Sequence, residues 1–295
     1  MLRITERMGQ VAARHDMLKA QYDMAMAQRE VSSGSKLNQA SDDAASAAKV
    51  ASIDDDKAAV GRYSRNVESG LSVADASDAA LASVSDLLLE AKELAVAMGN
   101  GTYHAEDRAL AATEIQSIRD QVLRMANTRH GDSYVFGGYL DETTPYDPTT
   151  GVYSGDSNRK QTEADEGYLV DHSLTGDEVF GAAGGSDVIG LLDDLIVGLN
   201  NNDTNAISQG VGDMITASDQ IAHSRTKLGH LMVRMEDQLE ILTDRNLGLA
   251  GDRQRFADAD AIESLSEMAQ AQQALSATLQ VGARILNTIS LVDYL

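Results

Sequence analysis

Apolar residues recur at alternating spacings of four and three toward both ends of this 295-residue chain. This spacing is typical of the contact face of a coiled-coil helix. We expect one such helix over residues 3–30 and another over residues 262–293. Their apolar positions form the expected assembly seam, which consists of Ile4, Met8, Val11, Leu18, Tyr22, Leu265, Met268, Leu275, Leu279, Leu286, Ile289 and Leu295. Because one narrow stripe does not stabilise an isolated helix in water, we predict that the two terminal helices pair.

Between these helices the pattern predicts several more. Apolar positions favour a long helix over 60–98 that ends at Asn100 and Gly101, and a second helix that returns from Ala111 to Arg129 as a hairpin. A short amphipathic helix is expected over 188–199 and a long one over 205–256. Both prolines of the chain, Pro145 and Pro148, lie in one short stretch, so nothing breaks the helices on either side.

The composition changes between residues 134 and 180. Five of the nine tyrosines and two of the three phenylalanines lie there, together with both prolines. Residues 151–153 and 168–170 have the pattern of short strands between turns. Residues 130–190 contain twelve acidic and two basic residues. We therefore expect a β-rich surface insert that faces solvent.

These elements predict a mainly α fold: an elongated helical bundle with its N- and C-terminal helices paired as a coiled coil, plus a small β-rich insert. The expected domains are a terminal coiled-coil domain with its connecting segment (1–48 and 256–295), a central helical bundle (49–139 and 187–255) and the surface insert (140–186).

A run of small polar residues follows the first helix. Ser32, Ser33 and Gly34 are expected to end it, and Ser41 to cap the next helix through its hydroxyl, with Asp42 and Asp43 favoured by the positive helix end. Two adjacent aspartates also raise the alternative of a cation site, although no third ligand stands nearby in the sequence.

Composition narrows the function classes. The net charge of −22 argues against nucleic acid or an anionic membrane as partner, because both repel a polyanion. No stretch has the eighteen or so apolar residues of a membrane span, so we expect no membrane insertion. The first residues lack the apolar core of a signal peptide, so if the protein leaves the cell, it does so by a route that needs no cleaved signal. The chain has no cysteine. His223 and His230 could share a helix face, but no carboxylate completes a metal site, and no nucleophile–base pair is evident. We expect no enzyme activity, no metal and no cofactor.

Several segments resemble the bacterial flagellin family. The most specific is the stretch from Ser32 to Ala44, in which Ser32, Ser33, Gly34, Asn38, Ser41, Asp42 and Asp43 match the family motif. Segments 63–67 and 106–108 are also similar. Segments 126–129, 134–138, 175–180, 282–286 and 291–295 are most similar to the family members that form the junction between flagellar hook and filament.

The resemblance implies a structural protein of the flagellum, located outside the cell and exported unfolded through the flagellar type III apparatus. It implies a ring between hook and filament that templates filament assembly, with the terminal helices lining the channel. The implied partners are further copies of the chain, the other hook-associated junction protein, flagellin and an export chaperone.

Two alternatives remain open. A short flagellin, which forms the filament itself, would share the terminal seams. An extracellular enzyme or metal-binding module carried on a coiled-coil stalk would need its site in the insert.

Overall fold

The computed structural model describes residues 2–181 and 185–292, without the side chains of 2–7, 9, 10 and 285–292. The chain divides into two compact units. Unit 1 contains Met1–Ala59 and Arg245–Leu295, and unit 2 contains Val60–Asp244. The domain limits expected at 48 and 256 remain a prediction.

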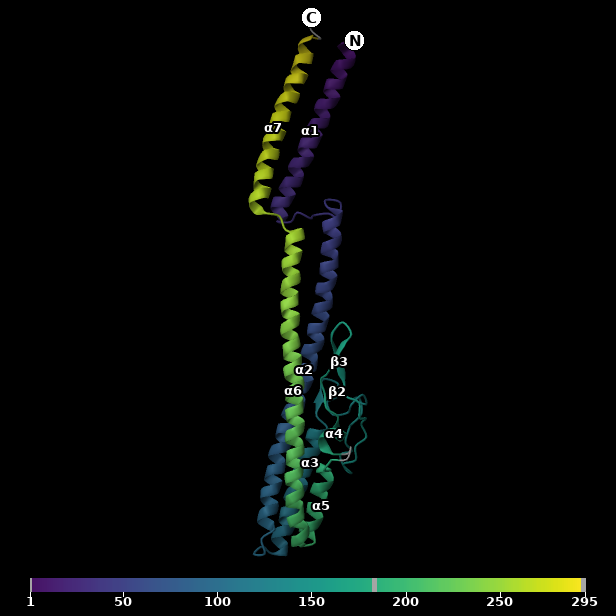
Figure 1. The fold of residues 1–295 in the computed structure, drawn as a ribbon, viewed down its shortest axis with the longest axis vertical. Helices are drawn as coiled ribbons and strands as arrows, with labels where there is room; N and C mark the ends of the chain where they lie inside the picture. Colours follow the sequence, from purple (N-terminus) through teal and green to yellow (C-terminus); the bar gives the residue numbers. More distant parts are fainter. Residues whose placement is uncertain (1, 182–184, 293–295) are drawn as a thin grey trace. The chain divides into compact units, whose positions relative to one another are not determined.

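In unit 1, α1 (Leu2–Ser33) and α7 (Ala261–Val292) pack side by side and run antiparallel, so that the beginning of α1 and the end of α7 lie at the same end of the pair (Figure 1). The expected pairing of the terminal helices is confirmed. The unit also contains the beginning of α2 (Ala44–Met98) and the end of α6 (Thr204–Ala257). There the Nε atom of Arg253 lies 2.9 Å from Oδ1 of Asp54, which joins α6 to α2.

Unit 2 is built on long stretches of α2 and α6, with α3 (Ala105–Ala126) and α5 (Val188–Asn200) packed against each other (Figure 1). The helices form because their apolar positions repeat every three to four residues and bury one continuous stripe each. Fully buried positions of this core include Leu81, Leu88, Ile115, Ile118, Leu192, Leu195 and Ile207. The helical part of the sequence-based prediction is thus confirmed.

Two arginines join the helices of unit 2. Arg225 on α6 donates two hydrogen bonds to the carboxylate of Asp78 on α2, at 2.9 and 3.0 Å. Arg119 on α3 is buried and its Nη2 atom donates to Asp193 on α5 at 3.0 Å. The two-pronged contact of Arg225 with Asp78 fixes the orientation of the two helices as well as their distance.

A third arginine closes the turns at one end of unit 2. Arg108, only 4% exposed, donates to the carbonyl oxygens of Met98 at 2.8 Å and Asn100 at 3.0 Å, and also to the side chain of Asn202. It therefore satisfies carbonyls at the C-terminal end of α2, where a positive charge is favoured. Sequence reasoning did not identify this role, although Arg108 lies in a segment that resembles the flagellin family.

Residues 129–180 contain two short antiparallel sheets and one helical turn, and the first of these sheets lies before the expected insert (140–186). Their bounds are β1 (Arg129–His130), β2 (Ser133–Tyr134), β3 (Gln161–Asp165), β4 (Tyr168–Asp171) and α4 (Gly176–Phe180). Strand β1 pairs with β2, and β3 with β4 in a register that sets Thr162 opposite Val170. The strand expected at 168–170 is confirmed. Residues 151–153 form no strand, since only Tyr153 makes an isolated bridge, to Tyr146.

The expectation that the insert faces solvent is only partly correct. Phe136, Phe180 and Tyr146 form a buried aromatic cluster, with the Phe180 ring centroid 5.5 Å from each of the other two. The insert also packs on the helices of unit 2. Gln238 on α6 donates to the Ala164 carbonyl at 3.1 Å, and Asn66 on α2 donates to the Glu163 carbonyl at 3.2 Å. The expected insert thus has a buried aromatic cluster, which it shares with Phe136 just before it, and it packs on the helices of unit 2.

Candidate assembly surface

The contact between α1 and α7 uses small and flexible side chains. On α1, Ala20 and Ala27 are buried and Met17 and Met24 are half-buried, at spacings of three and four. Over the part of α7 whose side chains the structure describes, the buried positions are Ser264 and Gly282, with Met268, Ala271, Leu275 and Thr278 half-buried between them. This periodicity is that of a coiled-coil seam made largely of alanine and methionine.

Two contacts fix the register of the pair. A Cβ added at Gly282 would lie 3.3 Å from the Cε atom of Met17, so the glycine allows a close approach of the helices. Further along, the Ser264 hydroxyl donates to Oε1 of Glu30 at 3.0 Å. The alanine and glycine positions therefore bring the two backbones close together, and methionine fills the remaining space.

The predicted seam lies elsewhere on α1. Met8, Val11, Leu18 and Tyr22 are 68, 70, 57 and 63% exposed. At 100° per residue, these positions lie on the face of α1 opposite Ala13, Met17, Ala20, Met24 and Ala27. The prediction that this stripe makes the contact between α1 and α7 of one chain is therefore wrong. Its role in assembly remains a prediction.

On α7 the predicted seam divides. Met268 and Leu275 are half-buried in the pair, whereas Leu265 and Leu279 are exposed, at 51 and 43%. The side chains of Ile4, Leu286 and Ile289, and the whole of Leu295, lie outside the described residues. The seam thus combines positions that join the helices of one chain with positions that this chain leaves uncovered.

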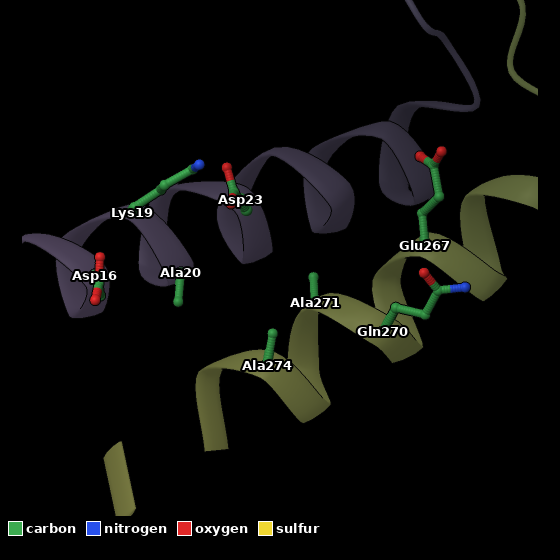
Figure 2. A pocket seen from close by; sticks show the side chains of 8 residues that line it. All are labelled: Asp16, Lys19, Ala20, Asp23, Glu267, Gln270, Ala271 and Ala274. Atoms are coloured by element: carbon green, nitrogen blue, oxygen red, sulfur yellow. The ribbon is translucent and has the colours of Figure 1, made fainter. Parts of the chain in front are cut away.

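The pair also carries a shallow groove, which Figure 2 shows from close by. Alanine methyl groups lie between the helices: Ala20 points toward α7, and Ala271 and Ala274 point toward α1. Charged side chains from both helices line its edges, among them Asp16, Asp23 and Glu267. The sequence pattern did not indicate this groove, because it arises from the packing of two distant segments.

The motif after α1 forms a joint with the segment between α6 and α7. Gly34 takes a left-handed conformation with φ +66°, which ends α1, and its carbonyl accepts from the Ala259 N–H at 3.0 Å. Ser35 pairs with Asp258 as an antiparallel bridge, and its hydroxyl donates to the Ala257 carbonyl at 2.9 Å. The Ser32 hydroxyl donates to the Gln28 carbonyl at 2.7 Å.

The second half of the motif begins α2. Oδ2 of Asp42 accepts the N–H groups of Asn38 and Gln39, at 3.1 and 2.8 Å. Asp43 accepts the N–H groups of Ala45 and Ser46, at 3.0 and 3.2 Å, and therefore caps α2. The Ser46 hydroxyl also donates to the carboxylate of Asp43. This bond contributes most to lowering the pKa of Asp43, and the two backbone N–H bonds lower it further. The predicted cap, the hydroxyl of Ser41, is replaced by this carboxylate, and the paired aspartates serve the turn and the helix start.

Comparison with known proteins gives a consistent answer. Residues 4–139 match the model of the bacterial flagellin N-terminal helical region. Flagellar hook-associated protein 3 of Escherichia coli is 26% identical over 278 residues, which cover 84% of this chain and 86% of that protein. Flagellar hook-associated protein 3 of Salmonella typhimurium is 30% identical over 152 residues, which cover 51% of this chain and 48% of that protein. Among solved structures, that of Bacillus cereus FlgL has a TM-score of 0.60 at 25% identity and covers 69% of this chain and 99% of its own.

The resemblance to the flagellin family, and within it to hook-associated protein 3, is confirmed.

The region that matches the flagellin family model can be located in the structure. It includes α1, the motif after it, α2, α3 and the first small sheet. The motif that carried the resemblance therefore has a visible structural role, because it ends one helix, starts the next and binds the segment before α7. Within the described residues no group of three or more His, Asp or Glu side chains is placed to hold a metal ion, and no helix there has the length and apolarity to cross a membrane.

Proposed function

We propose that this chain is a structural subunit of the bacterial flagellum that forms the junction ring between hook and filament and templates filament assembly. The similarity to hook-associated protein 3 over most of both chains supports this function. The observation that carries this proposal is the outer stripe of α1, which consists of Met8, Val11, Leu18 and Tyr22 and which α7 leaves uncovered. A chain that acts alone gains nothing from four large apolar side chains on the outer face of a terminal helix.

The stripe supplies a driving force for association. Each large apolar side chain that becomes fully buried contributes about 1.5–3 kcal/mol. Met8, Val11, Leu18 and Tyr22 therefore provide several kcal/mol if a neighbouring subunit covers them. Contacts that repeat from subunit to subunit close into a ring when the rotation between neighbours fits.

The partners follow from this function. They are further copies of the chain in the ring, the other hook-associated junction protein on one side, flagellin on the other, and an export chaperone. Nucleic acid and membrane insertion have no part in it, in keeping with the net charge of −22. The protein acts outside the cell, after type III export without a cleaved signal peptide. Its role is structural and not enzymatic.

The function is tested by deleting the gene in a flagellated strain that carries it. We expect cells that keep their hooks, lack attached filaments and release flagellin into the medium. A plasmid copy of the chain should restore attached filaments. Filaments formed by the purified protein alone would instead favour a short flagellin, and normal filaments in the deletion strain would reject both functions.

A further inference from the structure

The groove on the α1–α7 pair has a volume of about 350 Å³. Its floor is made by Ala20, Ala271 and Ala274, whose methyl groups leave room between the helices (Figure 2). Asp16 and Asp23 of α1 and Glu267 of α7 line it and are exposed, and Lys19 is the lining residue of opposite charge. No ion pair within the described part of the chain involves any of these three carboxylates. The groove is therefore acidic at its edges and apolar at its floor.

The outer stripe of α1 has the opposite properties. Val11 and Leu18 project from the helix, and Arg14 lies three residues after the first and four before the second, so it borders the same face. Arg14 is exposed and, among the described residues, has no ion-pair partner. The first 31 residues contain five basic and four acidic residues, in a chain of net charge −22. With one more basic than acidic residue, this segment does not repel an acidic surface.

We propose that the outer stripe of α1 in one copy of this chain docks in the acidic groove on the α1–α7 pair of the next copy. Val11 and Leu18 cover the alanine floor, and the guanidinium of Arg14 meets the carboxylates of Asp23 and its neighbours. The proposal rests on the proposed function and names the surfaces that join neighbouring subunits.

A second copy is the occupant that the charges and the shape favour. The groove accepts bulky side chains because its floor carries only methyl groups, and the stripe supplies such side chains. Stripe and groove are different surfaces of one molecule, so each copy offers both, and association continues from subunit to subunit until a ring closes. The pairing of opposite charges fixes the register of this contact and disfavours stripe-to-stripe pairing, in which Arg14 would face Arg14.

Arg14 and Asp23 cannot pair within one chain. They lie nine residues apart on one helix, a rise of about 13.5 Å, and they occupy different faces. Any coupling between these two positions in assembled flagella must therefore arise between copies. This separation makes a charge exchange in a single chain informative.

The test uses the full-length chain, expressed in the deletion strain. Arg14→Glu and Asp23→Arg are each expected to reduce the number of attached filaments by about tenfold, because each places like charges at the contact. The variant with both changes should return to within about twofold of the unaltered chain. Arg124→Glu, an exposed position on α3, makes the same charge change outside the pair and should leave filament number unaltered.

A cross-linking experiment tests the contact directly. The chain has no cysteine, so introduced thiols report only the chosen positions. In isolated hook–filament junctions, the chain with Val11→Cys and Ala274→Cys should form a ladder of covalent oligomers with a short thiol-specific cross-linker. Each single variant should remain monomeric. The pair Val11→Cys and Leu265→Cys, whose second position lies on α7 outside the groove, should give no ladder.

The outcomes separate the two proposals. If the unaltered chain restores filaments but the double charge variant fails to recover and no ladder forms, the groove is not the docking site and the junction function stands. If the unaltered chain does not restore filaments, the junction function falls and the docking proposal falls with it.

Discussion

The two units of the chain build their cores from different residues. Unit 2 packs large apolar side chains: Phe136, Phe180 and Ile118 are at most 1% exposed, although others such as Leu110 and Ile241 stay exposed. Unit 1 buries alanine, serine and glycine between α1 and α7, and leaves Leu18 and Tyr22 more than half exposed. Large buried side chains therefore stabilise unit 2 within the chain, whereas the largest described apolar side chains of α1 lie outside its contact with α7. We therefore expect folding and assembly to depend on different residues.

Amide hydrogen exchange on the isolated chain gives the most direct test of this contrast. Buried amides of α2 and α6 within 60–98 and 205–244 should exchange at least about a thousandfold more slowly than those of α1 and α7, because the large buried side chains of unit 2 hold its helices together. The measurement is exchange followed by fragment mass spectrometry. Equal protection in both units would contradict the contrast.

Truncation of a core aromatic residue should have the next largest effect. Phe180→Ala removes a ring that contacts Phe136 and Tyr146, and should lower the free energy of unfolding of unit 2 by about 3–5 kcal/mol. Phe256→Ala, at a position 37% exposed in unit 1, should leave that value nearly unaltered. Urea denaturation followed by circular dichroism measures both.

The sequence predicted the helices well and the surfaces less well, for one physical reason. Periodicity identifies the largest apolar residues, and it assigned Val11 and Leu18 to the pairing of α1 with α7. In this molecule those residues are exposed, and Ala20 and Ala27, which carry a weak hydrophobic signal, make the contact. In proteins that assemble, the strongest stripe need not be the one used within the chain.

Other errors arose where local sequence carries no signal. Strand β3 consists of Gln161–Asp165, which are mostly polar residues, and it forms because it pairs with β4. Residues 151–153 include residue types typical of strands, but no partner strand lies beside them in the described part of the chain. The cap of α2 is Asp43 and not Ser41, a choice between neighbouring good caps that depends on where the helix begins.

Removal of the buried guanidinium at the end of unit 2 should cost less than removal of the aromatic ring. Arg108→Ala leaves the carbonyls of Met98 and Asn100 and the side chain of Asn202 without their donor, and should lower the free energy of unfolding by about 2–3 kcal/mol. Arg124→Ala, an exposed arginine of the same helix, is the matched control. A similar loss in both variants would mean that helix propensity, and not the contacts of Arg108, sets the effect.

The insert of unit 2 should make stability depend on pH. Burial lowers the pKa of His172 below its usual 6.5, Lys160 adds to this effect, and Asp171 opposes it. A histidine with a lowered pKa in the folded state takes up protons more readily when unfolded, so stability rises with pH in this range. The free energy of unfolding is therefore unaffected by His172 above pH 6.5 and falls as the pH drops below that value.

Removal of the His172 imidazole should abolish this dependence of stability on pH. His172→Gln is expected to flatten the slope of the unfolding free energy between pH 5 and 7, measured by urea denaturation in steps of half a pH unit. His223→Gln, at an exposed position on α6, should keep the slope of the unaltered chain. An unaltered slope in His172→Gln would show that other groups cause it.

Leu18→Asp should have the smallest effect on stability and the largest effect on assembly. Leu18 is 57% exposed in the isolated chain, so Leu18→Asp removes little covered surface there and should change the unfolding free energy by less than about 0.5 kcal/mol. In the ring, the same change places a charge where an apolar side chain should be covered, and desolvation of that charge opposes association. We therefore expect normal folding and secretion of the variant but no attached filaments. Leu247→Asp, an exposed leucine on α6, should leave filament number close to normal, and equal loss in both variants would mean that added charge and not the stripe is responsible.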